Sequence, residues 1–494
     1  MNEADKKEIS SNMNYFRIIS LAGILLFSLF LNLCNNDFPL GYHIDEPKKI
    51  YFVLSGKQDF HLPILMLNSV RLASYFLHYK DPQRVVELGR KISAIMGTLI
   101  CLAFFLIISG LIPNPYDLMA TFALASTPIL VIHSHYLKED IYLTCFTMFS
   151  LLAYFSLVRA PQKYNVLLLG FFSSLALSSH YKGALLIPLF FMGPFIHQIR
   201  NRWQVLLRIF YAIPIVLLFF LAVDYQIFGD FSSFLGGLEY DFHRIQEGHG
   251  PKIYPLPHYF CFHLLNSILP GLTIPLAIIS LFALLFFLFK WNQLCFEDKF
   301  FILFLGVFYC AVEISPMKPA PGALRYILPL IPLLVYFAFK GFYFLEQNIT
   351  RFSFKVLFRV ILSLAVLFSI QRSIRLTYHL NRDTRERAEK LVKAHGQKVF
   401  FSIFGGREET GIACAEGARK LRKKGYRYVV VSSFYYKMFA YGTQLNGQPE
   451  HVFRWNGHFQ EFFSYPYVEI KPEYMSYAFS NPTLRIVDIR GDSP

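Results

Sequence analysis

Charged residues are scarce in this sequence. Only 16% of the 494 residues are Asp, Glu, Lys or Arg, whereas 54% are apolar and the mean hydropathy is positive. Soluble domains carry roughly a quarter charged residues, and one soluble core cannot absorb this much apolar surface. The composition excludes an ordinary soluble protein with a single core and favours repeated membrane spans.

Several common signatures are also missing. The seven cysteines form no CxxC pair and no zinc spacing, and Gly405-Gly406 has no GxGxxG or Walker pattern around it. The formal net charge of +15 is spread over many short connections, without a basic run interleaved with aromatic residues. The sequence therefore indicates no zinc module and no nucleotide site, and we expect no nucleic-acid partner.

The apolar residues recur in runs of about 17 to 25 residues, the helix length that crosses about 30 Å of hydrocarbon. About eleven spans are expected, at residues 18–34, 91–112, 116–135, 139–158, 164–180, 183–199, 205–228, 262–289, 300–315, 325–346 and 354–374. A cleaved signal peptide is the alternative for the first run. The length of that run and the absence of a small-residue cleavage site argue against it.

Basic residues in the short loops predict the orientation. With the N-terminus inside, the inside connections hold thirteen Lys and Arg residues and the short outside connections hold six. Eleven spans then place the C-terminal end outside. We expect a multi-pass membrane protein with its N-terminus inside and its C-terminal domain outside.

Two outside segments are long. In residues 35–90, the pieces Glu46 to Gly56 and His61 to Tyr79 have the pattern of helices that lie in the membrane interface, or of ordinary packed loop helices. Residues 229–261, rich in Gly, His and aromatic residues, are expected to form an irregular loop.

The composition changes near residue 376, which predicts a transmembrane domain over 1–375 and a soluble domain over 376–494. The pattern of the second domain predicts a small α/β layer. Its expected helices and strands alternate as Asp383 to His395, Lys398 to Ile403, Glu409 to Lys424 and Tyr428 to Ser432. The fold class is mainly α, a polytopic helix bundle with a small C-terminal α/β domain.

Acidic residues and histidines gather with Lys and Arg at the span ends on the outside, whereas the inside turns carry basic residues and no comparable acidic cluster. Ionisable residues at membrane depth are functional candidates by default. The candidates are Asp45, Glu46, His133, His135, Lys138, Glu139, Asp140, His180, Lys182, Lys318 and Arg325. Acids and cations around one cavity suit transfer from a phosphate-activated donor. A carboxylate can take the proton of an attacking hydroxyl, while Lys and Arg stabilise the departing phosphate.

Each of these residues also has a plainer interpretation. Lys138 and Lys318 have the positions of membrane-surface anchors, and Asp45-Glu46 could cap the helix that follows. A divalent metal ion is a possible cofactor, with Asp45, Glu139 and Asp140 as candidate ligands. His43, His133 and His135 are further candidate ligands.

The chain resembles the GT-C glycosyltransferases, specifically bacterial members similar to protein O-mannosyltransferases and to the aminoarabinose transferase of lipid A. The matching stretches are His43-Ile44-Asp45-Glu46-Pro47, His135-Tyr136-Leu137-Lys138-Glu139-Asp140, His180-Tyr181-Lys182-Gly183, Arg325-Tyr326 with Leu328-Pro329 and Pro332, and Asp383-Thr384-Arg385 at the entry to the soluble domain. Their order and spacing cover nearly the whole chain.

The resemblance implies roles for these residues. Asp45 is the expected general base and Glu46 its helper, Asp140 with Glu139 positions donor or acceptor, and Lys182 and Arg325 contact the donor phosphate. The further expected binding residues are Lys138, His135, His180, Lys318 and Tyr326. The implied donor is a polyprenyl-phosphate sugar, the acceptor is a lipid, glycan or protein, and the anomeric centre is inverted.

Two other classes of function stay open at the level of sequence. A transporter or flippase would show internal repeats and charges near the middle of the membrane. A polysaccharide ligase or polymerase of the cell envelope would carry its large loop late in the chain, whereas here the acidic loop comes first.

Overall fold

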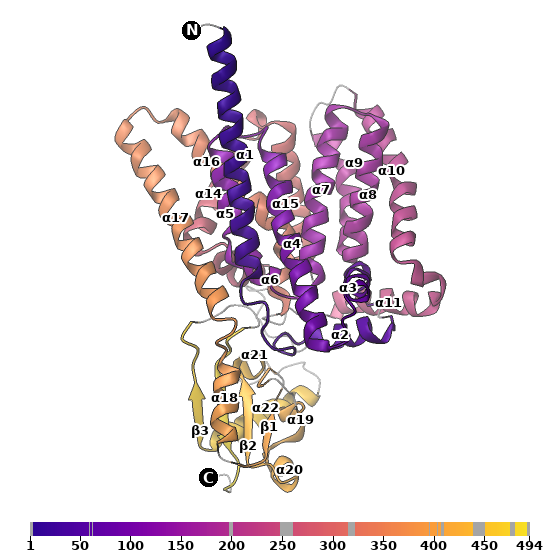
Figure 1. Cartoon of the computed structure of the whole chain (residues 1–494), viewed down its shortest axis with the longest axis vertical. Helices are drawn as coiled ribbons and strands as arrows, with labels where there is room; N and C mark the ends of the chain where they lie inside the picture. The colour runs from indigo at the N-terminus through magenta and orange to yellow at the C-terminus, as the bar shows by residue number, and fades with distance from the viewer. Residues whose placement is uncertain are drawn as a thin grey trace.

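The structure, a computed structural model, consists of a helix bundle with a smaller domain below it (Figure 1). It describes residues 3–58, 60–61, 63–196, 201–247, 260–314, 322–394, 396–402, 404–406, 410–437, 450–474 and 480–491. The bundle is all-helical and the lower domain holds a four-stranded sheet. The expected fold class is confirmed.

Six helices within the described residues are long and apolar enough to cross a membrane, and two bent helix pairs raise the number to eight. The six are α1 (Glu3–Leu33), α4 (Pro82–Ile108), α7 (Glu139–Arg159), α10 (Arg202–Val223), α16 (Ile331–Asn348) preceded by η5 (Gly322–Leu330), and α17 (Phe352–Tyr378). The bent pairs are α5 (Tyr116–Ala125) with α6 (Pro128–Ser134), and η3 (Leu264–Ile268) and α13 (Leu269–Gly271) with α14 (Ile274–Phe289).

Three further expected spans correspond to shorter or more charged helices. These are α8 (Lys163–Ser179), α9 (Leu186–Ile196) after η1 (Tyr181–Leu185), and α15 (Phe296–Glu313) after η4 (Trp291–Gln293). Over the described residues, each of the eleven expected runs therefore coincides mainly with helix, and the number of helices that fully cross a membrane stays a prediction.

The break between α5 and α6 shapes the lower end of the bundle. Pro128 at the start of α6 has no backbone N–H to continue the α5 hydrogen bonds, and the pair bends by 50°. As a result α6 is short and ends at Ser134. The segment from His135 to Lys138 follows it as a non-helical link, fully buried at the lower end of the bundle.

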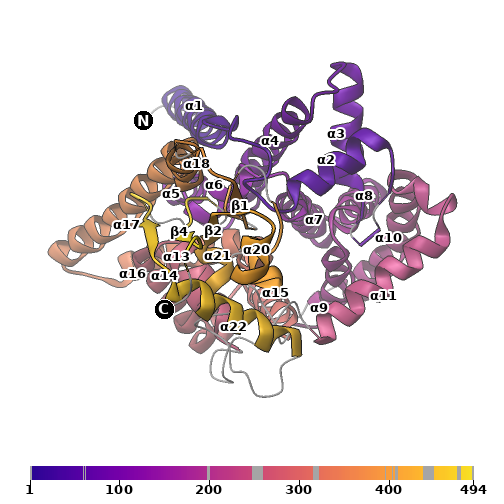
Figure 2. The same ribbon diagram turned by 90° about the horizontal axis from the view of Figure 1, so that it is seen from below.

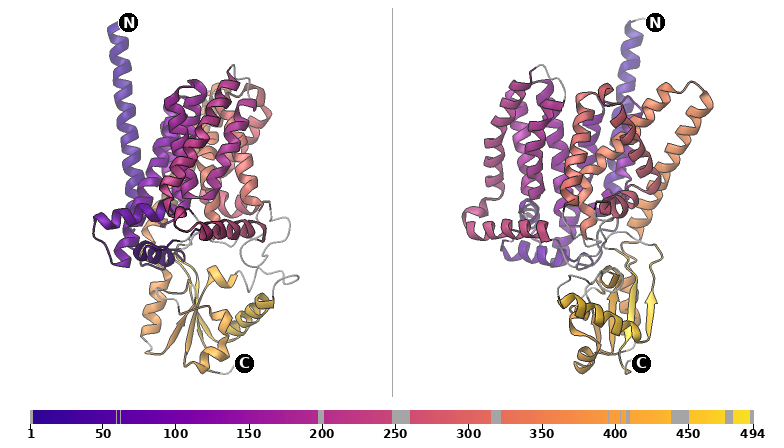
Figure 3. Two further views of the ribbon diagram at one scale, coloured as in Figure 1. Left: turned by 90° about the vertical axis from the view of Figure 1, so that its right-hand side faces the viewer. Right: turned by 180° about the vertical axis from the view of Figure 1, so that it is seen from behind.

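Three helices lie across this lower end (Figure 3), two of them where the sequence predicts interface helices. They are α2 (Glu46–Ser55), α3 (Leu65–Phe76) and α11 (Phe231–Glu247), the last preceded by η2 (Tyr225–Phe228). Exposed Leu72, Tyr75 and Phe76 give α3 an outward apolar face. Such a face suits a helix that lies in the membrane surface.

The expectation of an irregular loop over 229–261 is wrong for its first half, which is α11. Asp230 caps the helix by accepting the Ser233 N–H at 3.0 Å, and Phe234 packs against the Phe60 ring at 6.0 Å. A Cβ on Gly237 would lie 2.3 Å from the Phe60 carbonyl oxygen, so this glycine permits close packing. Residues 248–259 lie outside the described part of the chain.

The lower domain is built on a sheet of order β1-β2-β4-β3, with β1 and β2 parallel and the other pairs antiparallel. Its strands are β1 (Val399–Phe401), β2 (Tyr428–Ser432), β3 (Tyr467–Ile470) and β4 (Leu484–Asp488). Helix α18 (Thr384–Lys393) covers one face. The other face carries α19 (Ala413–Glu416), α20 (Ala418–Lys423), α21 (Ser433–Tyr436) and α22 (Glu450–Ser464).

The predicted α/β layer is present, with one difference. In place of a continuous helix from Glu409 to Lys424, the structure has α19 and α20, because Gly417 between them adopts a left-handed φ of +76°. His395, Ile403 and Glu409, which bound three of the expected elements, lie outside the described residues. Seen from below, the domain covers the ends of α5, α6 and α13, whereas α2, α3 and α11 lie below α7, α8 and α10 (Figure 2).

Candidate active site

Three segments bring opposite charges together at the lower end of the bundle: the loop before α2, the link between α6 and α7 with the first turn of α7, and η5. The Lys138 Nζ donates to the Asp45 carboxylate. The Arg325 guanidinium lies 3.6 Å from the same carboxylate and donates through Nε to Asp140 at 2.7 Å. Partners that lie 93 and 185 positions apart in the sequence thus form one charge cluster.

A second ion pair joins α2 to α7. Lys49, which the sequence did not single out, donates to the Glu139 carboxylate and to the Leu137 carbonyl oxygen at 3.2 Å. Lys138 also lies 3.5 Å from Glu139. Lys48 and Lys49 look alike in the sequence, and only the buried face of α2 distinguishes them.

Asp45 lies at the edge of the cluster. Its side chain is 39% exposed, compared with 3% for Lys138 and 11% for Arg325. Burial acts to raise the pKa of the Asp45 carboxyl, but the positive charges of Lys138, Arg325 and Lys49 hold that pKa well below its usual range. An ionised, partly exposed carboxylate therefore lies at the edge of the cluster.

Two neighbours of Asp45 have shifted pKa values as well. Burial lowers the pKa of Lys49 to about 8, despite its ion pair with Glu139. Burial also lowers the pKa of His43 well below its usual value, so its imidazole is neutral. The His43 Nδ1 accepts the Asp45 backbone N–H at 3.2 Å, which leaves the proton on Nε2 and fixes the loop conformation.

Glu46 is fully buried and is already engaged. It accepts hydrogen bonds from the Arg90 Nε at 3.1 Å and Nη2 at 2.5 Å, and from the Leu137 N–H at 3.1 Å. Arg90, also fully buried, donates to the carbonyl oxygens of Asn36 and Phe38. The pair ties α2, α4 and the Leu137-Lys138 link together, so its geometry suits positioning of Asp45 and Lys138.

Lys182 and Tyr326 extend the cluster on its other side. The Lys182 Nζ lies 3.6 Å from the centre of the Tyr326 ring, and the Arg325 guanidinium lies 5.5 Å from it. Lys182 and His180 are both within electrostatic reach of Asp140. The His180 Nδ1 accepts the Lys182 N–H at 3.2 Å and so caps η1.

His135 is placed differently. Its two ring nitrogens contact the carbonyl oxygens of Val131 at 2.7 Å and Cys34 at 3.0 Å. The ring therefore links the end of α6 to the end of α1 and faces backbone on both sides. Its role as a substrate-binding residue stays a prediction, and Lys318 lies outside the described residues.

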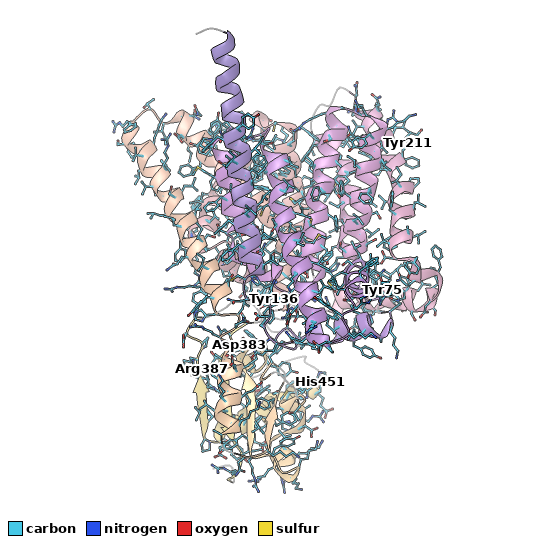
Figure 4. All side chains as sticks on the ribbon, in the orientation of Figure 1. Tyr75, Tyr136, Tyr211, Asp383, Arg387 and His451 are labelled. Atoms are coloured by element: carbon cyan, nitrogen blue, oxygen red, sulfur yellow. The ribbon has the colours of Figure 1, made fainter. Side chains whose placement is uncertain are left out.

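The lower domain meets the bundle at this end, where Asp383 lies just below Tyr136 (Figure 4). The fully buried Arg385 donates to the Tyr42 carbonyl oxygen at 2.8 Å and to Asp383 at 2.7 Å. Tyr42 lies three residues before Asp45. The Asp383-Thr384-Arg385 segment therefore holds the lower domain against the loop that carries Asp45.

Comparisons with known proteins give a match in structure and none in sequence. No protein-family model and no curated protein matches the chain. The oligosaccharyltransferase of Archaeoglobus fulgidus, crystallised with zinc and sulfate, superposes with a TM-score of 0.54 and 13% identity over 93% of this chain and 73% of that chain. ArnT from Cupriavidus metallidurans bound to undecaprenyl phosphate has a TM-score of 0.52 and 11% identity over 97% of this chain and 99% of that chain.

This chain has the GT-C fold. The match to ArnT extends over nearly the whole length of both chains, so it includes the helix bundle and the C-terminal domain together. The charge cluster lies where the helix bundle meets that domain.

A divalent metal ion does not fit this arrangement of side chains. Asp45, Glu139 and Asp140 each face Lys or Arg. Among the described residues, no group of three His, Cys, Asp or Glu side chains is placed to hold a metal ion. We therefore assign no step of the chemistry to a metal.

Proposed function

We propose that this protein transfers a sugar from a polyprenyl-phosphate-linked donor to a hydroxyl group of a lipid, glycan or protein on the periplasmic side of a bacterial inner membrane. The central observation is the Asp45 carboxylate at the exposed edge of a buried cluster that contains Lys138 and Arg325. Two structures of this fold support the donor class, ArnT with undecaprenyl phosphate and the archaeal AglB with dolichol-phosphate and an inhibitory peptide.

The balance of charge in the cluster suits a phosphodiester. Four cations, Lys49, Lys138, Lys182 and Arg325, face three carboxylates, Asp45, Glu139 and Asp140. One positive charge is in excess, and a sugar phosphodiester carries one negative charge. Binding of the donor would therefore neutralise the site.

The chemistry is a single displacement. Asp45 accepts the proton of the acceptor hydroxyl while the hydroxyl oxygen forms a bond to C1 of the sugar. The bond between C1 and the phosphate oxygen breaks, and its electron pair leaves with polyprenyl phosphate. Lys138 and Arg325 stabilise the charge that develops on this leaving group. One displacement at C1 inverts the anomeric configuration.

The same cations regulate the base. Without a donor, Lys138 and Arg325 help to keep the pKa of Asp45 low, which makes it a weak base. A donor phosphate attracts these cations and reduces their hold on Asp45. Asp45 then becomes a stronger base at the stage when the acceptor hydroxyl has to be deprotonated.

A donor panel tests the proposal. The full-length protein in lipid nanodiscs is incubated with synthetic polyprenyl-phosphate hexoses and pentoses, and release of polyprenyl phosphate is compared with empty nanodiscs. We expect at least one donor to be cleaved, and the anomeric configuration of the product reports inversion. If no donor is cleaved above the background with water, lipid, glycan or peptide acceptors, the proposed function is wrong.

The phosphate contacts have their own test. Lys138→Gln and Arg325→Gln should each weaken undecaprenyl phosphate binding by about 10- to 100-fold, the range for a lost hydrogen bond to a charged group. Arg387→Gln is the matched control, since Arg387 is 54% exposed and pairs with Glu473 in the lower domain. Equal affinity in all three variants would remove Lys138 and Arg325 from the phosphate site.

A further inference from the structure

His133 differs from the other histidines near the site. It lies in α6, is fully buried, and neither of its ring nitrogens has a hydrogen-bond partner among the described residues. His135, two residues further along, contacts two carbonyl oxygens, and His180 accepts a backbone N–H. A buried polar group without a partner destabilises the fold, so its presence requires an explanation.

The location of His133 next to the charge cluster explains why an unpaired polar side chain is buried there. Its ring lies 6.1 Å from the Tyr136 ring, which in turn lies 4.8 Å from the His43 ring beside Asp45. His133 is within electrostatic reach of Arg325, Asp140 and Lys138. It therefore borders the charge cluster on the side of the bundle interior, whereas Asp45 borders it on the exposed side.

The inference rests on the proposed function. Under that function, the acceptor binds on the exposed side of the cluster and the donor sugar binds on the interior side. The acceptor arrives from water at Asp45, so the donor sugar lies further in. A neutral imidazole offers one N–H donor and one acceptor nitrogen, as a sugar hydroxyl does. The phosphate instead requires cations, which Lys138 and Arg325 provide.

We propose that His133 binds the sugar of the donor, with its two ring nitrogens hydrogen-bonded to sugar hydroxyl groups. A packing role does not explain the residue, since an apolar side chain would fill this part of α6 without burying polar atoms. A site that hydrogen-bonds a hydroxyl group also discriminates strongly against analogues that lack it. His133 is therefore a specificity-determining residue for the sugar.

The test compares two ligands on the full-length protein in nanodiscs. Undecaprenyl phosphate has no sugar, and the second ligand is the member of the donor panel that the wild type cleaves fastest. His133→Phe should leave the affinity for undecaprenyl phosphate within twofold of the wild type and raise the KM for the sugar donor by about 10- to 100-fold. His133→Gln, which keeps a donor and an acceptor, should recover part of this loss.

Deoxy analogues of the same donor sharpen the comparison. The wild type should discriminate against one or more deoxy sugars, and His133→Phe should lose that discrimination. The inference is overturned if His133→Phe has the KM and the sugar selectivity of the wild type, or if it loses both ligands equally. If the wild type cleaves no donor at all, the proposed function is contradicted, and the inference about His133 loses its basis.

Discussion

At the scale of residues, the pair of Glu46 and Arg90 separates a positioning role from a chemical one. Both side chains are fully buried and hydrogen-bonded to each other. Glu46→Gln leaves the Arg90 charge without its partner, and breaking a buried pair lowers the free energy of unfolding by about 3 to 5 kcal/mol. We expect a clear drop in thermal unfolding temperature, together with a loss of activity.

The control for this prediction is an exposed pair. Arg387→Gln breaks an ion pair between side chains that are 54% and 70% exposed, so it should change stability by less than about 1 kcal/mol. The double variant Glu46→Gln with Arg90→Gln should recover part of the lost stability. If Glu46→Gln unfolds at the wild-type temperature, the positioning role is wrong.

Some site residues were predictable one by one, and others were not. Asp45, Lys138, Asp140 and Arg325 stand out because they are ionisable at the ends of apolar runs. Arg90 has the same signal, at the edge of the expected span 91–112, but its partner Glu46 lies 44 residues away. The pairing that turns Glu46 toward Arg90, and Asp45 toward Lys138, exists only in the folded chain.

At the scale of elements, Asp224 fixes the position of α3. It lies directly after α10, is 1% exposed, and accepts the Ile64 N–H at 2.8 Å just before α3 begins. Burial raises the pKa of Asp224 from 3.8 to about 6. Between these two values the folded protein binds more protons than the unfolded chain, so stability should fall as pH rises from about 4 to 6.

Asp224→Asn should remove this component of the pH dependence. Unfolding temperatures of the variant and the wild type should converge near pH 4, and the variant should become relatively more stable by pH 7. Asp230→Asn is the control, because hydrogen bonds from Ser233 lower the pKa of Asp230. Removing the Asp230 carboxyl should therefore not make the variant more stable than the wild type as pH rises from 4 to 7. Parallel curves for Asp224→Asn and wild type from pH 4 to 7 would contradict the assignment.

Gly183 sets the position of Lys182 in η1. A Cβ at this residue would lie 2.6 Å from backbone atoms of Ala176 in α8, and backbone cannot move aside as a side chain can. Gly183→Ala should therefore displace η1 and reduce activity by at least tenfold. Gly110→Ala, where a Cβ meets nothing within 4 Å, should retain wild-type activity. Full activity in Gly183→Ala would show that η1 tolerates the shift.

The element that the sequence concealed is α11. Its two glycines and His243 are typical of loops. The apolar residues Phe231, Phe234, Leu235 and Leu238 have helical spacing, and the contact of Phe234 with Phe60 shows which face is packed. The long spans were predictable because a segment of about twenty predominantly apolar residues can satisfy its backbone hydrogen bonds within a membrane as a helix.

At the scale of the whole molecule, helices α2, α3 and α11 and the C-terminal domain lie at the same end of the bundle (Figures 1 and 3). The excess of basic residues at the opposite end predicts that this end is outside. Alkaline phosphatase fused after Gly56 or Gly396 should therefore be active, and a fusion after Ala160 should be inactive. An inactive fusion at either of the first two positions would contradict the outward-facing site.

The sheet was predictable only in part, for a reason of scale. The parallel pair β1 and β2 is local and has a strong apolar pattern, whereas β4 reaches β2 from 52 residues later and completes the sheet through long-range pairing. The docking of the domain through Arg385 and Tyr42 spans 343 residues. Such contacts follow from packing of the whole chain and have no local signal.

The central claim is that Asp45 is the base of glycosyl transfer. Its most direct test is the Asp45→Asn variant, with kcat measured on the fastest donor and undecaprenyl phosphate affinity measured in parallel. We predict that kcat falls by about 100- to 10,000-fold, the usual contribution of a general base. The lipid phosphate should bind at least as tightly, because the neutral amide of this variant no longer competes for Lys138. A kcat within twofold of the wild type would contradict the claim.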